Sequence, residues 1–337
     1  MMLSRKFFGA LLVAAAALVH SAWVHAEKIK VGAFSSVSDA AIYVAIDKKY
    51  FAEQGIEVEM VKVDSGATMV TELANGNLDV SGGSPGAGLY NAVRQGIPMK
   101  IVADKGSALP GHGYFAFLVR KDLADKVKTA ADFRGRVIAV TGYGRGASSE
   151  VTIGRVLASA NLKESDVKQV NMSFPDILAA LGTGRAEIGV VAEPLVTLAV
   201  EKGVAVIWKR SDEVYPNQQY GALMYGPSII KNPDLARKFM VAYLKGARFY
   251  NDALRGKAPR EELVAILTKH TSVKNPQLYG KMVFPGLHPN GNLNLAGMEY
   301  DAKWWAANGR MKELVDPAKL VDMSYAEHAV RQLGAYR

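Results

Sequence analysis

Residues 28–61 read KIKVGAFSSVSDAAIYVAIDKKYFAEQGIEVEMV. The first seven residues, 28–34, predict a strand, and residues 40–51 predict a helix that ends in a turn at Gly55. Residues 56–61 then alternate polar and apolar side chains, which is typical of a half-buried strand. A strand, a helix and a second strand in this order predict a mainly parallel sheet with helices on its faces.

This alternation continues through much of the chain and restarts once. The first series adds a helix through Leu73, a strand at 78–81, a helix at 87–95 and a strand at 98–103. The second series begins at residues 114–119 and continues with strands at 137–140, 167–172, 186–192 and 204–208. From residue 233 onwards the pattern is mostly helical, with expected helices at 233–254, 260–270, 276–283 and 295–308.

The two series predict an α/β fold with two lobes and a hinge of two strands. We expect chain crossings near Leu118–Arg120 and Ala222–Tyr225. The first lobe would then comprise residues 27–119, the second residues 120–221, and residues 222–337 would return to the first lobe with a helical C-terminal region. Ligands of open α/β sheets bind at the carboxyl ends of the strands, and these ends would face the cleft between the lobes.

The N-terminus has the layout of a secretory signal peptide. Arg5 and Lys6 precede the apolar run 7–19, and a more polar stretch ends at Ala26 with small residues at the cleavage positions. The alternative is a membrane anchor, but a transmembrane helix needs roughly 20 apolar residues and this run is shorter. We therefore expect cleavage after Ala26 and a mature protein in the periplasm.

Composition excludes several classes of protein. The chain has no cysteine, which excludes disulfides, thiolate metal sites, cysteine nucleophiles and a lipid-modified N-terminal cysteine. Loss of the signal peptide would lower the formal charge from +9 to about +7. The basic residues are scattered along the chain, so no stripe for nucleic acid or lipid is expected. Their excess favours solubility and a mild preference for small anions.

Four stretches of the chain resemble one known family. They are residues 43–58, residues 73–80, residues 131–140 and residues 180–189 followed by Glu193-Pro194. In this order they resemble the periplasmic binding proteins for nitrate, sulfonates, taurine and thiamine-pyrimidine-like solutes. The resemblance implies the two-lobe, type II periplasmic binding protein fold. It also implies a small-molecule ligand and, as partners, the permease and ATPase of an ABC transporter.

Three segments with small residues precede expected helices: 65–68, 84–87 and 142–149. Free backbone N–H groups and the helix dipole make such a terminus an anion site, and small residues allow close approach. The alternative is that their Ser and Thr residues are ordinary helix caps. Together with two serines after the first strand, these segments supply the expected backbone contacts: Ser35, Ser36, Gly66, Ala67, Ser84, Pro85, Gly86, Ala147 and Ser148.

Side chains of three kinds complete the predicted site. Arg145 is the candidate for a bidentate contact with a carboxylate or sulfonate, with a solvated loop arginine as the alternative. Glu193 is either a pocket contact or a carboxylate at a helix start, and His112 could reach the cleft from a glycine-rich loop or lie at the surface. The expected apolar walls, each of which could instead belong to the core or rim, are Phe34, Tyr143 and Tyr220.

Two sharper motifs are set aside. Residues 142–147 match the dinucleotide pattern G-x-G-x-x-A, but the next strand ends in Met172-Ser173-Phe174 and not in an acidic residue. No H-E-x-x-H and no cluster of histidines is present, which argues against the common metallohydrolases. We expect a monomeric binding protein without cofactor or metal that closes around a small organic anion. An exported enzyme or a sensing domain on the same scaffold is the alternative.

Overall fold

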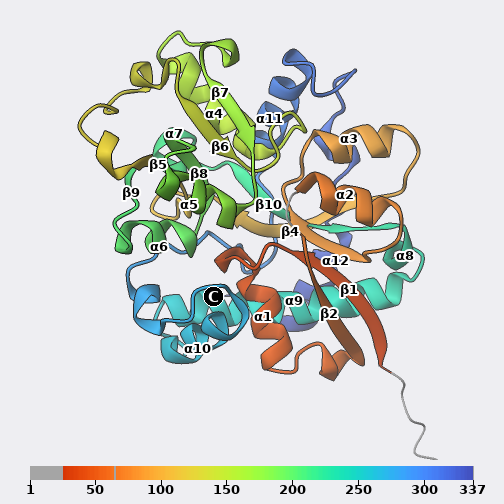
Figure 1. The fold of residues 1–337 in the computed structure, drawn as a ribbon. Helices are drawn as coiled ribbons and strands as arrows, with labels where there is room; N and C mark the ends of the chain where they lie inside the picture. Colours follow the sequence, from red (N-terminus) through yellow and green to blue (C-terminus); the bar gives the residue numbers. More distant parts are fainter. Residues whose placement is uncertain (1–25, 64–65, 337) are drawn as a thin grey trace, which may run out of the picture.

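The computed structural model describes residues 26–63 and 66–336, which form two lobes on two separate β-sheets (Figure 1). Within these residues each sheet has five strands. The order is β2-β1-β3-β10-β4 in the first sheet and β7-β6-β8-β5-β9 in the second. The signal-peptide prediction falls on residues 1–25 and lies, like Ser65, outside the described residues.

The first sheet comprises β1 (Glu27–Ala33), β2 (Ile56–Lys62), β3 (Val80–Gly83), β4 (Lys100–Ser107) and β10 (Gln219–Tyr225). The second comprises β5 (Phe115–Arg120), β6 (Val137–Val140), β7 (Lys168–Asn171), β8 (Ile188–Ala192) and β9 (Ala205–Arg210). The predicted parallel pairs are present in both sheets, β1 with β2 and β3, and β6 with β7 and β8.

Each sheet also contains one strand that runs antiparallel to its neighbours. Strand β10 pairs antiparallel with β3 and β4, and β5 pairs antiparallel with β8 and β9. In both cases the chain has just arrived from the other sheet through a short connection. A parallel pair would need a longer crossover, usually a helix. The α/β class is therefore as predicted, but both sheets are mixed.

The two connections, residues 108–114 and 211–218, are bonded to one another. The Ala108 amide donates to the Gln218 carbonyl at 3.0 Å, and the Asn217 amide donates to the Ala108 carbonyl at 2.8 Å. Both connections precede the crossings expected near Leu118–Arg120 and Ala222–Tyr225. The reason is that β5 pairs wholly within the second sheet and β10 wholly within the first.

Helices cover the faces of both sheets (Figure 1). Up to residue 201 they are α1 (Ala40–Asp47), α2 (Gly66–Ala74), α3 (Ala87–Arg94), α4 (Ser148–Ser159), α5 (Phe174–Thr183) and α6 (Leu195–Glu201). In the second half they are α7 (Ser211–Val214), α8 (Pro227–Ile230), α9 (Pro233–Leu254), α10 (Arg260–His270), α11 (Leu295–Ala307) and α12 (Ser324–Leu333). The helix expected at 40–51 ends at Asp47, and Lys49 beyond it has a left-handed φ of 61°.

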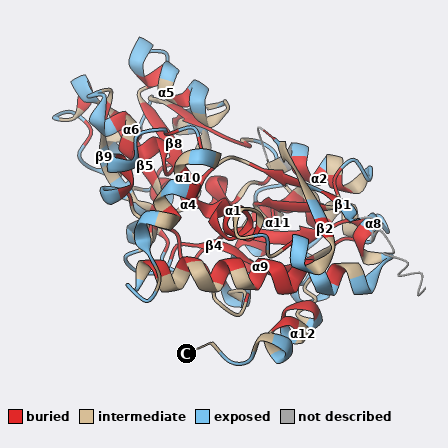
Figure 2. Cartoon of the chain, turned by 90° about the horizontal axis from the view of Figure 1, so that it is seen from below, coloured by how far each residue is buried: buried red, intermediate tan, exposed pale blue. Residues whose placement is uncertain are grey.

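The long helix α9 anchors the core of the first lobe. Pro233 at its first position and the Asn232 side chain, which accepts a hydrogen bond from the Leu235 amide, begin the helix. Its buried face packs on α1 and α12, and Figure 2 shows this face buried and the opposite one partly exposed. A Cβ at Gly246 would lie 2.0 Å from the Ala41 carbonyl oxygen, so glycine permits the close approach of α1. Among the described residues, no helix combines the length and apolarity needed to cross a membrane.

Candidate binding site between the lobes

A cavity of about 540 Å³, counted with the space open to solvent, lies between the two sheets. We call it the inner compartment. It is lined from the first lobe by Phe34, Ser36, Ser38, Gly66, Gly83, Ser84, Lys105, Tyr220 and Gly221. It is lined from the second lobe and the connection before it by Tyr114, Phe115, Thr141, Ala147, Ser148, Ser149, Phe174, Val190 and Ala192. Every one of these residues is buried or half-buried.

Among the described residues that line the inner compartment, the charged side chain is Lys105, near the end of β4. Its ammonium lies 2.5 Å from Oδ1 of Asp39 and donates to Oγ of Ser38 at 2.9 Å. Both charged side chains are buried, with exposures of 1% for Lys105 and 0% for Asp39. Asp39 is itself held by the Ser36 amide, which donates to its Oδ2 at 2.9 Å. An ammonium has three N–H donors, so one remains for a group in the compartment.

Aromatic rings form the apolar part of the wall. Phe115 and Tyr220 are stacked with centroids 4.2 Å apart, and Tyr114 meets each of them edge-on. Phe34 and Phe174 meet edge-to-face at 5.8 Å. The Tyr220 hydroxyl lies 2.6 Å from Thr152 Oγ1, and burial raises its pKa far above the usual range. The wall therefore offers flat apolar surface and neutral phenols.

The first turn of α4 supplies the hydroxyl-rich side of the compartment. Ser148 and Ser149 follow the N-cap Ala147, and the first amide groups of a helix lack partners within the helix. Ser84 of the first lobe meets this turn: its Oγ accepts from the Ser148 amide at 3.0 Å and lies 2.8 Å from Ser148 Oγ. The α4 terminus therefore faces the compartment and also contacts the opposite lobe.

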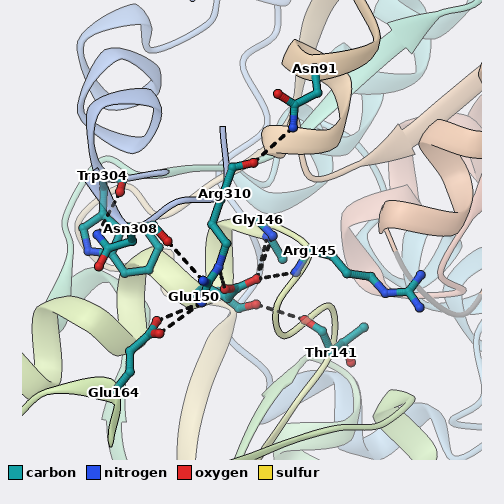
Figure 3. Close-up of polar contacts among 11 residues, drawn as sticks. Asn91, Thr141, Arg145, Gly146, Glu150, Glu164, Trp304, Asn308 and Arg310 are labelled. Atoms are coloured by element: carbon teal, nitrogen blue, oxygen red, sulfur yellow. Dashed lines mark hydrogen bonds and ion pairs between the residues drawn. The ribbon is translucent and has the colours of Figure 1, made fainter. Parts of the chain in front are cut away.

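A buried carboxylate positions the loop before α4 (Figure 3). Glu150 Oε1 accepts hydrogen bonds from the amides of Arg145, Gly146 and Ala147 at 3.0, 2.7 and 3.3 Å. Its Oε2 accepts from Arg310 Nε at 2.7 Å, and Arg310 also binds Glu164 at 3.1 Å. Arg310 belongs to the C-terminal region, so that region helps to fix the loop that borders the compartment.

Two smaller spaces adjoin the inner compartment. The outer compartment, of about 480 Å³ with its open space, shares Phe34, Ser36, Phe174 and Ala192 with it. Its other lining residues are Ser35, Lys62, Val63, Ser173, Pro175, Glu193, Pro194, Leu195 and Ser272. A side cleft of about 260 Å³ shares Gly66, Ser84 and Ala147 and is lined further by Val70, Gly86, Gly88, Gly142, Arg145 and Gly146.

The structure brings about half of the predicted site residues to the inner compartment. These are Phe34, Ser36, Gly66, Ser84, Ala147, Ser148 and Tyr220. Ser35 and Glu193 line the outer compartment, and Gly86 lines the side cleft. Pro85 is buried but lines none of the three spaces, and Ala67 lies in the first turn of α2.

Four predicted side chains have other surroundings. Arg145 is exposed, lines the side cleft and points away from Glu150 (Figure 3), so it does not line the inner compartment. His112 lies 2.9 Å from the Phe284 carbonyl, and Tyr143 packs against the core of the second lobe. Glu193 binds Thr197 and Arg210, and burial raises the pKa of its carboxyl.

Sequence reasoning missed the Asp39–Lys105 pair and much of the aromatic wall. The predicted strand ended at Ala103, two residues short of Lys105, whereas β4 continues to Ser107. Asp39 stands in a predicted linker, where a carboxylate is ordinary. A charged residue at the carboxyl end of a buried strand was the available signal. Phe115 and Phe174 lie 59 positions apart in the sequence, and no sequence pattern indicates that they are in contact.

The two mixed α/β sheets with a cavity between them define the type II periplasmic binding protein fold. The chain belongs to the NMT1/THI5-like family, whose match covers residues 37–253. The resemblance noted in the sequence is thereby confirmed at the level of the family and the fold. A comparison with curated protein sequences finds no match.

Solved structures show the same fold at low sequence identity. The nitrate-binding protein NrtA of Synechocystis PCC 6803 is 16% identical, with a TM-score of 0.74 over 91% of this chain and 89% of its own. The alkanesulfonate-binding protein SsuA of Xanthomonas axonopodis pv. citri, bound to MOPS, is 17% identical, with a TM-score of 0.69 over 88% and 98%. The desulfurization enzyme DSZB is 14% identical, with a TM-score of 0.63 over 91% and 100%. At these identities the likeness concerns the fold alone.

Proposed function

We propose that this chain is the periplasmic solute-binding component of an ABC importer and that it binds a small organic anion between its lobes. The family, the fold and the leader-like N-terminus support this role. The ligand would carry a carboxylate or sulfonate on an apolar body. It would be delivered by a monomer to a permease and ATPase after hinge closure about residues 108–114 and 211–218.

The observation that carries the proposal is the ammonium of Lys105 in the inner compartment. Two of its donors are used by Asp39 and Ser38, and the third is available to an acidic oxygen. The first turn of α4 adds the side chains of Ser148 and Ser149 and the positive end of a helix dipole. The aromatic wall suits the apolar body of the same ligand. Lys105 takes the role that the sequence analysis gave to Arg145.

A ligand screen by thermal unfolding tests this proposal. Benzoate and related aromatic carboxylates, aliphatic sulfonates and neutral pyrimidines would be compared. At 100 times its Kd a ligand stabilises the folded protein by about 2.7 kcal/mol, which is readily detected. We expect stabilisation by acids, and loss of it in Lys105→Met but not in Lys62→Met, which changes an exposed lysine of the outer compartment. Stabilisation by neutral compounds alone would contradict anion binding.

Among the described residues, the arrangement to weigh for the enzymatic alternative is the pair of Ser38 and Lys105 at 2.9 Å. A serine nucleophile needs a neighbouring base with a free lone pair. The Lys105 side chain is engaged in an ion pair with Asp39 and has no lone pair as an ammonium. We therefore propose binding without chemical change, and mass spectrometry of a bound ligand recovered after incubation should return the ligand intact.

A further inference from the structure

Two phenylalanine rings stand at the boundary between the inner and outer compartments. Phe34 and Phe174 line both spaces, and their rings meet edge-to-face with centroids 5.8 Å apart and planes at 65°. Phe34 follows β1 of the first lobe, and Phe174 begins α5 of the second. The contact is therefore made between the lobes, at the place where the two spaces join.

The two compartments differ in the exposure of the residues that line them. All residues that line the inner compartment are buried or half-buried, whereas the outer compartment includes exposed Lys62, Pro175 and Ser272. These exposed residues line only the outer compartment and Lys105 lines only the inner one, and the ring pair stands where the two spaces join. Ser36 and Ala192, the other shared residues, are small and leave the two rings as the bulk of the boundary.

Both rings are held in place by their surroundings. Phe174 makes a second edge-to-face contact with Phe115, at 5.8 Å, and Phe115 stacks on Tyr220. Phe34 lies 5.8 Å from the Lys105 ammonium, and the backbone turns sharply after it because Ser35 has a φ of 59°. A left-handed serine is held by the structure around it, so this turn fixes where the Phe34 ring lies.

We propose that Phe34 and Phe174 are specificity-determining residues that separate the two compartments and limit the length of the ligand. This rests on the proposed function, since it describes the same binding site. The ligand lies wholly in the inner compartment, with its acidic group at Lys105 and its apolar end against the ring pair. A compact acid such as benzoate or a short alkanesulfonate fits this space. A longer acid has to push the two rings apart. The contact between Phe34 and Phe174 is then lost, and the lobes cannot close fully over the ligand.

The chain contains no cysteine, so a single introduced thiol can report access to the inner compartment without knowledge of the ligand. Ser149→Cys places that thiol in the inner compartment, on the first turn of α4, where a helix N-terminus favours the reactive thiolate. Ser272→Cys places a reference thiol in the outer compartment. Each thiol would be labelled with methanethiosulfonates of increasing size, with and without Phe174→Ala.

We expect Phe174→Ala to accelerate labelling of Ser149→Cys about two- to tenfold, the range that corresponds to loss of its contact with Phe34. The effect should grow with reagent size, and labelling of Ser272→Cys should not change. Leu195→Ala, which widens only the outer compartment, is the matched control and should leave both rates unchanged. Phe174→Leu repeats the test if the alanine variant does not fold. Equal labelling rates of Ser149→Cys with and without the Phe174 ring would overturn the proposal that the ring pair separates the two compartments.

Binding of a sulfonate series provides the second readout. In the unchanged protein, the stabilisation against thermal unfolding should fall sharply from propanesulfonate to octanesulfonate. In Phe174→Ala the longer sulfonates should stabilise the protein more, relative to the shorter ones, than they do in the unchanged protein. An unchanged length profile would overturn the role in specificity. If no acid stabilises the protein, the proposed function fails, while the labelling rates still decide whether the rings separate the compartments.

Discussion

The amide of Ala87 donates a hydrogen bond of 2.9 Å to the carbonyl oxygen of Gly146 and so joins the two lobes. Ala87 begins α3 of the first lobe, and Gly146 lies in the loop before α4 of the second. The Ser148 amide crosses the same boundary to Ser84, and the Val37 amide crosses to the Glu193 carbonyl at 3.3 Å. The lobes are therefore in direct contact around the inner compartment, as in a closed form.

Gly86→Ala should hold the lobes apart. A Cβ at Gly86 would lie 2.4 Å from the Gly146 carbonyl oxygen, and overpacking of this kind costs about 1–3 kcal/mol. Because the clash exists only when the lobes meet, we expect ligand affinity to fall about five- to 150-fold with little change in the unfolding midpoint of the unliganded protein. Isothermal titration calorimetry and small-angle X-ray scattering would measure the two effects.

Gly88→Ala is the matched control for that experiment. Gly88 lies in the first turn of α3, the helix that Gly86 caps, and a Cβ there meets only Val70 Cγ1, at 4.0 Å. It should leave affinity unchanged and stabilise the helix by about 0.5–1 kcal/mol. Equal affinities in the two variants would mean that the contact of Ala87 with Gly146 does not contribute to closure.

Lys105→Met should destabilise the protein and abolish anion binding. It leaves the carboxylate of Asp39 buried without its partner, and breaking a buried ion pair costs about 3–5 kcal/mol. Adding Asp39→Asn removes the unpaired charge, so the double variant should recover most of the stability but not the affinity. Urea unfolding and calorimetry would follow the two properties separately. A double variant that binds acids normally would exclude Lys105 from the site.

Arg310→Met should weaken the loop that borders the compartment. It removes the charged hydrogen bonds to Glu150 and Glu164, each worth about 1.5–3 kcal/mol. We expect lower stability, lower ligand affinity and faster amide hydrogen exchange at residues 145–147. Arg331→Met, which removes an exposed arginine 4.0 Å from Glu327, should change none of these. Unchanged exchange at 145–147 in Arg310→Met would show that Glu150 positions the loop alone.

The stability of the protein should depend on the protonation of Asp301. This residue of α11 is buried, accepts a hydrogen bond from Gln218, and has a pKa raised by burial to about 7. Since the folded state binds the proton more tightly than the unfolded state, the contribution is complete below about pH 4 and is lost as the pH rises to about 7.

Asp301→Asn removes this pH dependence. Relative to the variant, the unchanged protein should lose up to about 1.4 kcal/mol per pH unit across that window, as followed by urea unfolding at several pH values. Asp125→Asn, at a fully exposed carboxylate, is the control and should follow the unchanged protein. Parallel curves for Asp301→Asn and the unchanged protein would show that Asp301 ionises normally.

The repeated strand–helix pattern predicted the fold, because each lobe repeats a local unit whose periodicity is visible in a short window. The alternation at Ile56–Lys62 and the apolar run at Ile188–Ala192 both became strands. The antiparallel strands β5 and β10 could not be assigned to a sheet in this way. Their partners lie far away in the sequence, and pairing depends on the path that the chain takes between the lobes.

The candidate site was predicted best where it consists of backbone and small residues. Ser84, Ala147 and Ser148 line the inner compartment. They could be predicted because small residues before a helix mark its N-terminus in the sequence. The direction of a long side chain leaves no such mark. Arg145 lies in the expected loop, yet its side chain extends into the side cleft, while Lys105 faces the inner compartment. The direction of these long side chains depends on contacts between the lobes, which a local sequence pattern does not contain.

The place of β10 in the first sheet also has a consequence for the order of folding. Residues 115–210 supply all strands of the second sheet as one uninterrupted segment, so that lobe can form as soon as this segment has been synthesised. The first sheet has to wait, because β10 lies between β3 and β4 and follows them by more than a hundred residues. Pairing over such a separation is slow. We therefore expect the first lobe to complete its sheet last, after the second lobe has formed.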